Sequence, residues 1–247
     1  MSVRMQGFWA VFNRELKSYF TTPIAYVFLV IFLSASAYRT FRGGFFEMRQ
    51  ADMRMFFMNF PLLFLFLVPV TAMRLWAEER RSGSIELLFT LPITVTQAVL
   101  GKFFAAWLFL AIALALTFPM PITVCYLGEP DIGLIITGYL GSLLMAGGFL
   151  AIGCFFSAVS KNQVISCILT VVACAVLVFA GMPTTLNYVS RFLPAGLVSA
   201  IENMSFQTHF ESLQKGVIEF KDLSYFVILI IGWIAASAIV LDERKAS

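Results

Sequence analysis

The chain has 247 residues, of which 60% are hydrophobic and 13% charged, with a net charge of +3 and a mean hydropathy of +0.88. Soluble domains are about 45–50% apolar and about 25% charged, so the composition excludes an ordinary soluble domain. The small, dispersed positive charge gives no reason to expect nucleic acid as a partner.

The first predicted element is an amphipathic helix over Gly7–Phe20. Its apolar face holds Phe8, Phe12, Leu16 and Tyr19 with Trp9 beside them, and its polar face holds Arg14 and Lys17. Such a helix lies in the membrane interface, with Trp at headgroup depth. Pro23 predicts a break after it, because proline disfavours helical geometry in the preceding residue. The alternative is a cytoplasmic extension of the first span.

Six stretches then carry no Asp, Glu, Lys, Arg or His: Ser18–Tyr38, Met55–Met73, Phe103–Gly128, Ile132–Ser160, Asn162–Ser190 and Leu223–Leu241. A spanning helix needs about 20 mostly apolar residues. A charge at mid-membrane costs about 2.5–3.5 kcal/mol on the insertion scale. The runs do not alternate apolar and polar residues, so they predict helices and not barrel strands. We therefore expect an all-α membrane protein with one domain over 1–247 and spans near 22–40, 56–75, 97–118, 132–157, 163–182 and 223–241.

Six spans place both termini on one side of the membrane. If that side is the cytoplasm, ten Lys and Arg lie inside and seven outside, a modest bias that favours cytoplasmic termini. The four Arg between Arg39 and Arg54 oppose this orientation.

Residues 74–94, between the second and third spans, form the most informative polar segment. Glu78, Glu79, Arg80 and Arg81 must leave the membrane, and Gly83 permits a turn. A short helix over Ser84–Thr90 is then predicted, with Ser84 as N-cap, Glu86 in its first turn, an apolar ridge of Ile85, Leu88 and Phe89, and Pro92 as its end. An apolar ridge on the charged side of the membrane indicates a docking surface for a partner.

The fourth span carries a stripe of small residues, Gly138, Ser142, Ala146, Gly147 and Ala151. The stripe allows close approach of another helix, either in the same chain or in a second copy. The second span holds two prolines, Pro61 and Pro69. The simpler interpretation is that they kink the helix, and a more specific hypothesis is that they form a gating hinge. The four cysteines lie in apolar runs and are expected to pack as small hydrophobic residues.

Between the fifth and sixth spans, Met182–Asp222 is moderately apolar and broken at Pro194. Two short helices that dip into or lie on the outer leaflet are expected on either side of this break. Phe206 and Phe210 are predicted to face lipid or the last two spans. His209 has no partner of metal-binding type in the sequence, so a surface or capped histidine is favoured over a ligand.

These features together resemble the ABC-2 family of transporter permeases, the membrane subunits of type V ABC exporters. The resemblance rests on the interfacial helix, on the run from Glu78 to Leu88 followed by Leu91-Pro92-Ile93 and Gly101-Lys102, and on the short outer helices. It covers essentially the whole chain. Ser205-Phe206, Thr208-His209-Phe210, Gly216-Val217-Ile218 and Asp222 further resemble the subgroup of permeases named after gliding motility, and the copper-related permeases of nitrous-oxide reductase maturation are near relatives.

The resemblance implies a permease subunit that forms a translocation pathway and couples to a separate ABC ATPase for export or mechanotransmission. The coupling segment would comprise Glu78, Glu79, Arg80, Gly83, Ser84, Ile85, Glu86, Leu88 and Phe89. The implied partners are the ATPase, a second permease copy or homologue, an extracytoplasmic auxiliary protein and the lipid bilayer. The chain has no phosphate-binding G-x-x-x-x-G-K-[ST] loop, so ATP and Mg²⁺ would belong to the ATPase and no cofactor to this chain. The implied location is the bacterial inner membrane.

Two other functions compete with this reading. Glu78-Glu79 resembles the start of the EExxxR motif of intramembrane CAAX-type proteases, but the motif needs Arg where this chain has Gly83. We therefore expect no enzymatic activity. A non-transporting anchor that recruits an ATPase and an extracytoplasmic partner remains the alternative, because the spans carry no charge of the kind that ion or proton transport usually needs.

Overall fold

The computed structural model describes residues 3–43, 45, 52–83 and 93–246, and every regular element in these residues is a helix. In chain order the helices are α1 (Val3–Thr21), α2 (Pro23–Arg42), α3 (Arg54–Met58), α4 (Phe60–Ala72), α5 (Ala77–Ser82), α7 (Val95–Ala115), α8 (Pro119–Leu127), α9 (Ile132–Val159), α10 (Gln163–Phe179), α11 (Pro183–Val189), α12 (Ala195–Asn203), α13 (Phe206–Gln214) and α14 (Phe220–Ala246). The all-helical class predicted from the sequence is confirmed.

Five helical segments are long and apolar enough to cross a membrane: Pro23–Arg42, Phe60–Ser82, Val95–Leu127, Ile132–Val159 and Phe220–Glu243. A sixth is reached if α10 and α11, which meet at 79°, count as one broken span. The chain is therefore a multi-pass membrane protein with five or six candidate spans. They follow the order of the charge-free stretches, and the third is longer than expected because α8 prolongs α7.

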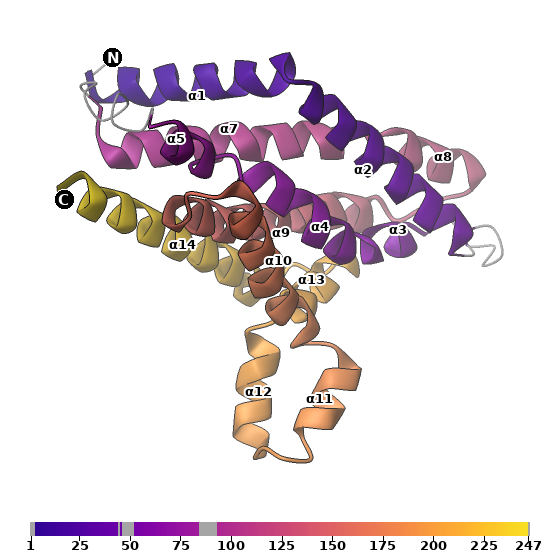
Figure 1. Cartoon of the computed structure of the whole chain (residues 1–247). Helices are drawn as coiled ribbons and strands as arrows, with labels where there is room; N and C mark the ends of the chain where they lie inside the picture. Colours follow the sequence, from indigo (N-terminus) through magenta and orange to yellow (C-terminus); the bar gives the residue numbers. More distant parts are fainter. Residues whose placement is uncertain (1–2, 44, 46–51, 84–92, 247) are drawn as a thin grey trace.

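Helix α9 forms the centre of the bundle and contacts α4, α7, α10, α13 and α14 (Figure 1). Its small residues explain how so many neighbours fit around one helix. A Cβ atom added at Gly138 would meet Phe57 at 2.3 Å, and one added at Gly153 would meet Ala72 at 2.3 Å. The stripe of small residues therefore packs within the chain.

The two termini lie at the same end of the bundle, where α1 runs alongside α7 (Figure 1). The break predicted between the first two elements is present: α1 ends at Thr21 and Pro23 opens α2. Pro61 lies in the first turn of α4, where a missing N–H costs nothing, whereas Pro69 lies inside that helix.

The segment between α10 and α14 forms three short helices, one more than the sequence predicted. The break at Pro194 is confirmed, because Pro194 is the N-cap of α12. Phe206 of α13 is fully buried, with its ring centroid 4.8 Å from Phe149 of α9 and 5.9 Å from Phe226 of α14. Helix α13 is thus part of the bundle.

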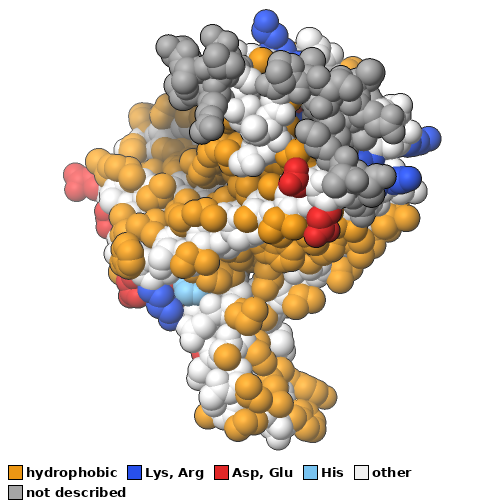
Figure 2. Space-filling view, turned by 90° about the vertical axis from the view of Figure 1, so that its left-hand side faces the viewer, with side chains coloured by type: hydrophobic (Ala, Val, Ile, Leu, Met, Phe, Trp, Pro, Cys, Tyr) orange, Lys and Arg blue, Asp and Glu red, His pale blue; other side chains and the backbone are white. Residues whose placement is uncertain are grey.

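Helices α11 and α12 form a hairpin that projects from the bundle, and neither contains a buried residue (Figures 1 and 2). The exposed apolar side chains on it are Tyr188, Phe192, Leu193, Leu197 and Met204. The neighbouring helix α10 also presents an apolar stripe, which includes Val164, Ile168, Val172 and Val176. This side of the molecule is therefore apolar over two adjoining elements.

Candidate functional site

In the sequence, residues 84–92 of the proposed coupling segment follow α5 and precede α7. Ser84, Ile85, Glu86, Leu88 and Phe89 lie outside the described residues. Both flanks of the segment are described. Gly83 ends α5 with φ +74°, so it makes the predicted turn in a backbone region that side chains disfavour. Thr94 begins α7 with a capping box to Gln97.

A buried ion cluster lies beside the start of this segment. Lys102 of α7 is only 2% exposed, and its Nζ lies 3.0 Å from Glu15 Oε1 of α1 and 3.0 Å from Glu79 Oε1 of α5. The ammonium also lies 5.1 Å from the centre of the Trp76 ring, within cation–π range. One cation therefore joins three helices that are distant in sequence.

Arg14 completes the cluster from the solvent side. Its Nη2 lies 2.7 Å from Glu15 Oε1 and 3.2 Å from Glu79 Oε1, while half of its side chain is exposed. Burial disfavours the charged form of Glu15, but Lys102 and Arg14 outweigh that effect and hold the pKa of this carboxyl below its ordinary value. Two cations and two carboxylates thus balance one another.

Gly101, the neighbour of Lys102, explains how α1 approaches α7 closely enough for this pairing. A Cβ atom at Gly101 would lie 3.0 Å from Val11 and 3.2 Å from the carbonyl oxygen of Phe8. The two residues therefore stabilise the same contact in different ways. Gly101 allows α1 to approach α7 closely, and Lys102 binds the Glu15 carboxylate of α1.

Helix α5 is also fastened to the end of α9. Ser157 Oγ accepts hydrogen bonds from the backbone N–H groups of Trp76 at 2.9 Å and Ala77 at 3.0 Å, and donates to the carbonyl of Met73 at 3.0 Å. Arg80 Nη1 donates to the carbonyls of Ala158 and Val159, both at 2.6 Å, which otherwise are open groups of a helix C-terminus. We call these contacts and the ion cluster together the coupling junction: Arg14, Glu15, Trp76, Glu79, Arg80, Lys102 and Ser157.

The residues predicted from sequence occupy different parts of this junction. Glu79, which the resemblance places in the coupling segment, has its Oε1 paired within the chain, and its Oε2 is buried without a hydrogen bond among the described residues. Arg80 binds α9, and Glu78 pairs at 3.1 Å with Arg74 on the exposed side. Gly83 has the positive φ of a turn residue, and its part in aiming residues 84–92 stays a prediction.

The apolar face of α1 rests partly on α7. Phe8 contacts Phe104 with ring centroids 6.2 Å apart, and Tyr19 stacks on Phe109 at 5.0 Å. Phe12 is half-buried and stacks on Phe8, while Trp9 and Lys17 are exposed. Part of the apolar face of α1 therefore covers protein, and the interfacial position of the helix stays a prediction.

A second buried polar pair lies toward the other end of the bundle. His209 Nδ1 lies 2.7 Å from Asp222 Oδ1, and its Nε2 lies 2.9 Å from the carbonyl oxygen of Asn203. Tyr225 stacks on the imidazole at 4.0 Å. Of the two settings expected for His209, a surface or a capped histidine, the structure shows a buried histidine whose ring nitrogens are capped. Among the described residues, no three His, Cys, Asp or Glu side chains are grouped as a metal site would require.

Sequence reasoning missed Glu15, Trp76, Lys102 and Ser157 as members of the junction. The position of Lys102 could have indicated its role, because it is the last charged residue before a 26-residue charge-free run. If that run begins inside the protein, the lysine is buried and needs an anionic partner. Glu15 gave no such signal, because it lies between Arg14 and Leu16 on a helix that has a solvent-facing side.

Comparison with known proteins agrees with this architecture. The model of the ABC-2 family transporter proteins matches residues 18–241, which is nearly the whole chain. No curated protein matches it. Because the match spans all candidate membrane helices, the chain belongs to the ABC-2 family of transporter membrane proteins.

Proposed function

We propose that this chain is the permease subunit of an ABC transporter that receives mechanical work from a separate ATPase through residues 84–92. The coupling junction is the observation that carries the proposal. Ion pairs and hydrogen bonds of this junction hold α5, the helix that precedes that segment, against α1, α7 and α9. A displacement of the segment would therefore move several helices together.

Ile85, Leu88 and Phe89 would fill a groove of the ATPase, and Glu86 would meet a basic group there. Glu79 supports the coupling from within the chain, since its paired carboxylate holds α5 against α1 and α7. Both termini and the segment would lie in the cytoplasm of a bacterial cell, with the chain in the inner membrane.

A second permease copy or a homologue would complete the translocation pathway. The exposed apolar surface of α10 and of the α11–α12 hairpin supports this part of the proposal, because it exceeds what isolated surface hydrophobic residues explain. An extracytoplasmic auxiliary protein would contact the end of the bundle that lies away from the termini. The gliding-motility-like subgroup fits the motifs of α13.

The docking step is tested with Leu88→Asp. A charge in a desolvated contact is strongly unfavourable when it has no partner, so the variant should insert normally and lose the ATPase. The measurement is co-purification of the ATPase from native membranes at matched expression, with ATP hydrolysis by the recovered complex. Asn13→Asp, which adds the same charge at an exposed position of α1, is the control.

Full retention of the ATPase by Leu88→Asp would show that residues 84–92 are not the docking element. The alternative function, a non-transporting anchor, shares the docking step but not the coupling. It is favoured instead if Lys102→Met keeps the ATPase bound, leaves its hydrolysis rate unchanged and leaves the cellular process intact.

A further inference from the structure

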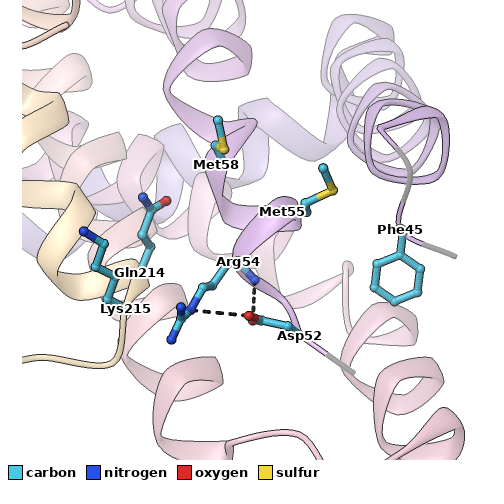
Figure 3. A pocket seen from close by; sticks show the side chains of 7 residues that line it. All are labelled: Phe45, Asp52, Arg54, Met55, Met58, Gln214 and Lys215. Atoms are coloured by element: carbon cyan, nitrogen blue, oxygen red, sulfur yellow. Dashed lines mark hydrogen bonds and ion pairs between the residues drawn. The ribbon is translucent and has the colours of Figure 1, made fainter. Parts of the chain in front are cut away.

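A cavity of about 480 Å³ lies between α3 and α13, away from the end of the bundle that holds the termini (Figures 1 and 3). Ligand sites for small molecules typically measure about 300–1,000 Å³. Arg54, Met55 and Met58 line it from α3, and Gln214 and Lys215 line it from the end of α13. The coupling junction lies elsewhere, so this cavity is a separate feature.

A second cavity of about 220 Å³ adjoins the first and shares Met55 and Met58 with it, and the two together form a groove. Its walls are mostly apolar, with Pro61 and Leu62 from α4 and Val178 from α10. Met58 lines both cavities and is 64% exposed, so the groove is open to the surface at this residue. A long apolar chain could therefore follow the groove from one cavity into the other.

The charges around this groove are unequal. Arg39, Arg54 and Lys215 line the two cavities, while Asp52 is the one carboxylate among their described lining residues. Asp52 lies 3.4 Å from Arg54, and Lys215 lies 2.6 Å from Glu211, but both cations are more than half exposed. Exposed ion pairs are weak, so a ligand anion can recruit both cations.

Gln214 supplies a polar group that lacks a partner. The residue is 8% exposed, it lines the larger cavity, and its Oε1 has no hydrogen bond within the described structure (Figure 3). Buried polar atoms of this kind are rare in folded proteins. A ligand hydroxyl in the cavity would satisfy this oxygen.

We propose that the groove binds an anionic phospholipid from the membrane leaflet that lies away from the termini. The phosphate would lie between Arg54 and Lys215, a headgroup hydroxyl would donate to Gln214, and an acyl chain would follow Met55 and Met58 into the smaller cavity. The excess of cations selects the anionic headgroup, and the apolar walls select a lipid over a soluble anion. Methionine suits the lining of this groove because its flexible side chain can adapt to a mobile acyl chain.

The test is native mass spectrometry of the delipidated permease, titrated with phosphatidylglycerol or phosphatidylcholine. Phosphatidylglycerol should bind about tenfold more tightly, and Arg54→Ala with Lys215→Ala should abolish the preference. Arg191→Ala, which removes an exposed cation from the hairpin, should leave it unchanged. Met55→Trp should weaken both lipids by filling the groove without changing charge.

Equal affinity for the two lipids, or a preference that survives the double substitution, would overturn the proposal. Displacement of the lipid by glycerol 1-phosphate at equal concentration would assign the site to a free phosphate ester instead. Should the double variant fold poorly, the salt dependence of the wild-type protein decides: the preference must fall as ionic strength rises. None of these measurements needs the ATPase, so their failure would leave the proposed coupling untouched.

Discussion

Lys102 shows how one buried charge is kept in an apolar molecule. Removing an ammonium from water is costly, and attraction to partners offsets the cost only where the geometry is good. Here two carboxylates at 3.0 Å and the face of Trp76 surround the ammonium. Such a cluster contributes little net stability when complete, but loss of Lys102 leaves two partly buried carboxylates to share the half-exposed Arg14.

Lys102→Met should therefore destabilise the protein by about 3 kcal/mol, at the lower end of the range for a broken buried pair, since Glu15 and Glu79 keep some exposure. Unfolding in detergent measures the effect. Adding Glu79→Gln should restore part of the loss, because Arg14 then balances one carboxylate and not two. Lys17→Met, an exposed lysine of α1, should change the free energy of unfolding by no more than about 0.5 kcal/mol. A similar small effect for Lys102→Met would contradict the assigned geometry.

Glu15 makes the free energy of unfolding depend on pH in the acidic range. An unfolded glutamate titrates near pH ~4.3, and in the folded protein the pKa of Glu15 is lower than its ordinary value. The stabilisation is therefore fully present above pH ~4.3 and is lost as the pH falls through the folded pKa. Unfolding temperatures of wild type and Glu15→Gln should differ by a constant amount at neutral pH and converge below pH ~4.3. Curves that stay parallel on acidification would refute this role.

At the scale of elements, α9 is the central helix of the bundle, because its small residues allow the neighbouring helices to pack closely against it. Gly153 lies against Ala72 of α4, which leaves no flexible side chain to move aside. Helix α9 also ends in the coupling junction through Ser157. The same helix thus fixes the position of α4 along its length and the position of α5 at its end.

Gly153→Ala is expected to destabilise the protein by about 1–3 kcal/mol, because the added methyl group would overlap the Ala72 side chain and force α4 and α9 apart. Thermal unfolding in detergent measures the change. Gly232→Ala on α14 is the matched control, since no atom lies within 4 Å of its added Cβ. Equal stability of the two variants would show that α4 and α9 are not in such close contact.

At the scale of the whole molecule, the ends of the bundle differ in kind. One end holds both termini, α5 and the coupling junction (Figure 1). The buried His209–Asp222 pair and the lipid groove lie away from that end. The apolar hairpin projects to the side of the bundle (Figure 2). This polarity suits a protein that receives a force on one face of the membrane and acts on the other.

Orientation is tested by labelling introduced cysteines in intact cells with an impermeant maleimide. The background must lack the four native cysteines, because Cys125 is exposed. Cysteines in place of Glu129 and Glu202, both exposed, should react from outside, whereas one in place of Ser82 should react only after lysis. Labelling of the Ser82 position in intact cells would reverse the orientation.

The sequence alone determined the all-helical membrane class, the approximate spans, the break at Pro23 and the turn at Gly83. Each of these depends on residues that are close in the chain: a charge-free run long enough for the bilayer, a proline that restricts its neighbour, a glycine that accepts positive φ. Charge-free runs and turn residues act on their neighbours in the chain, so their effects can be predicted from the linear sequence.

Only the tertiary structure decided what the polar residues do. Glu15 and Lys102 are 87 positions apart, and Arg14 and Glu79 are 65 apart, so no local pattern pairs them. The third outer helix likewise depends on contacts of Phe206 with Phe149 and Phe226, which lie on two different helices. In a membrane protein, most apolar side chains can pack equally well against lipid or against another helix. Which of the two they contact depends on how the helices are arranged in the tertiary structure.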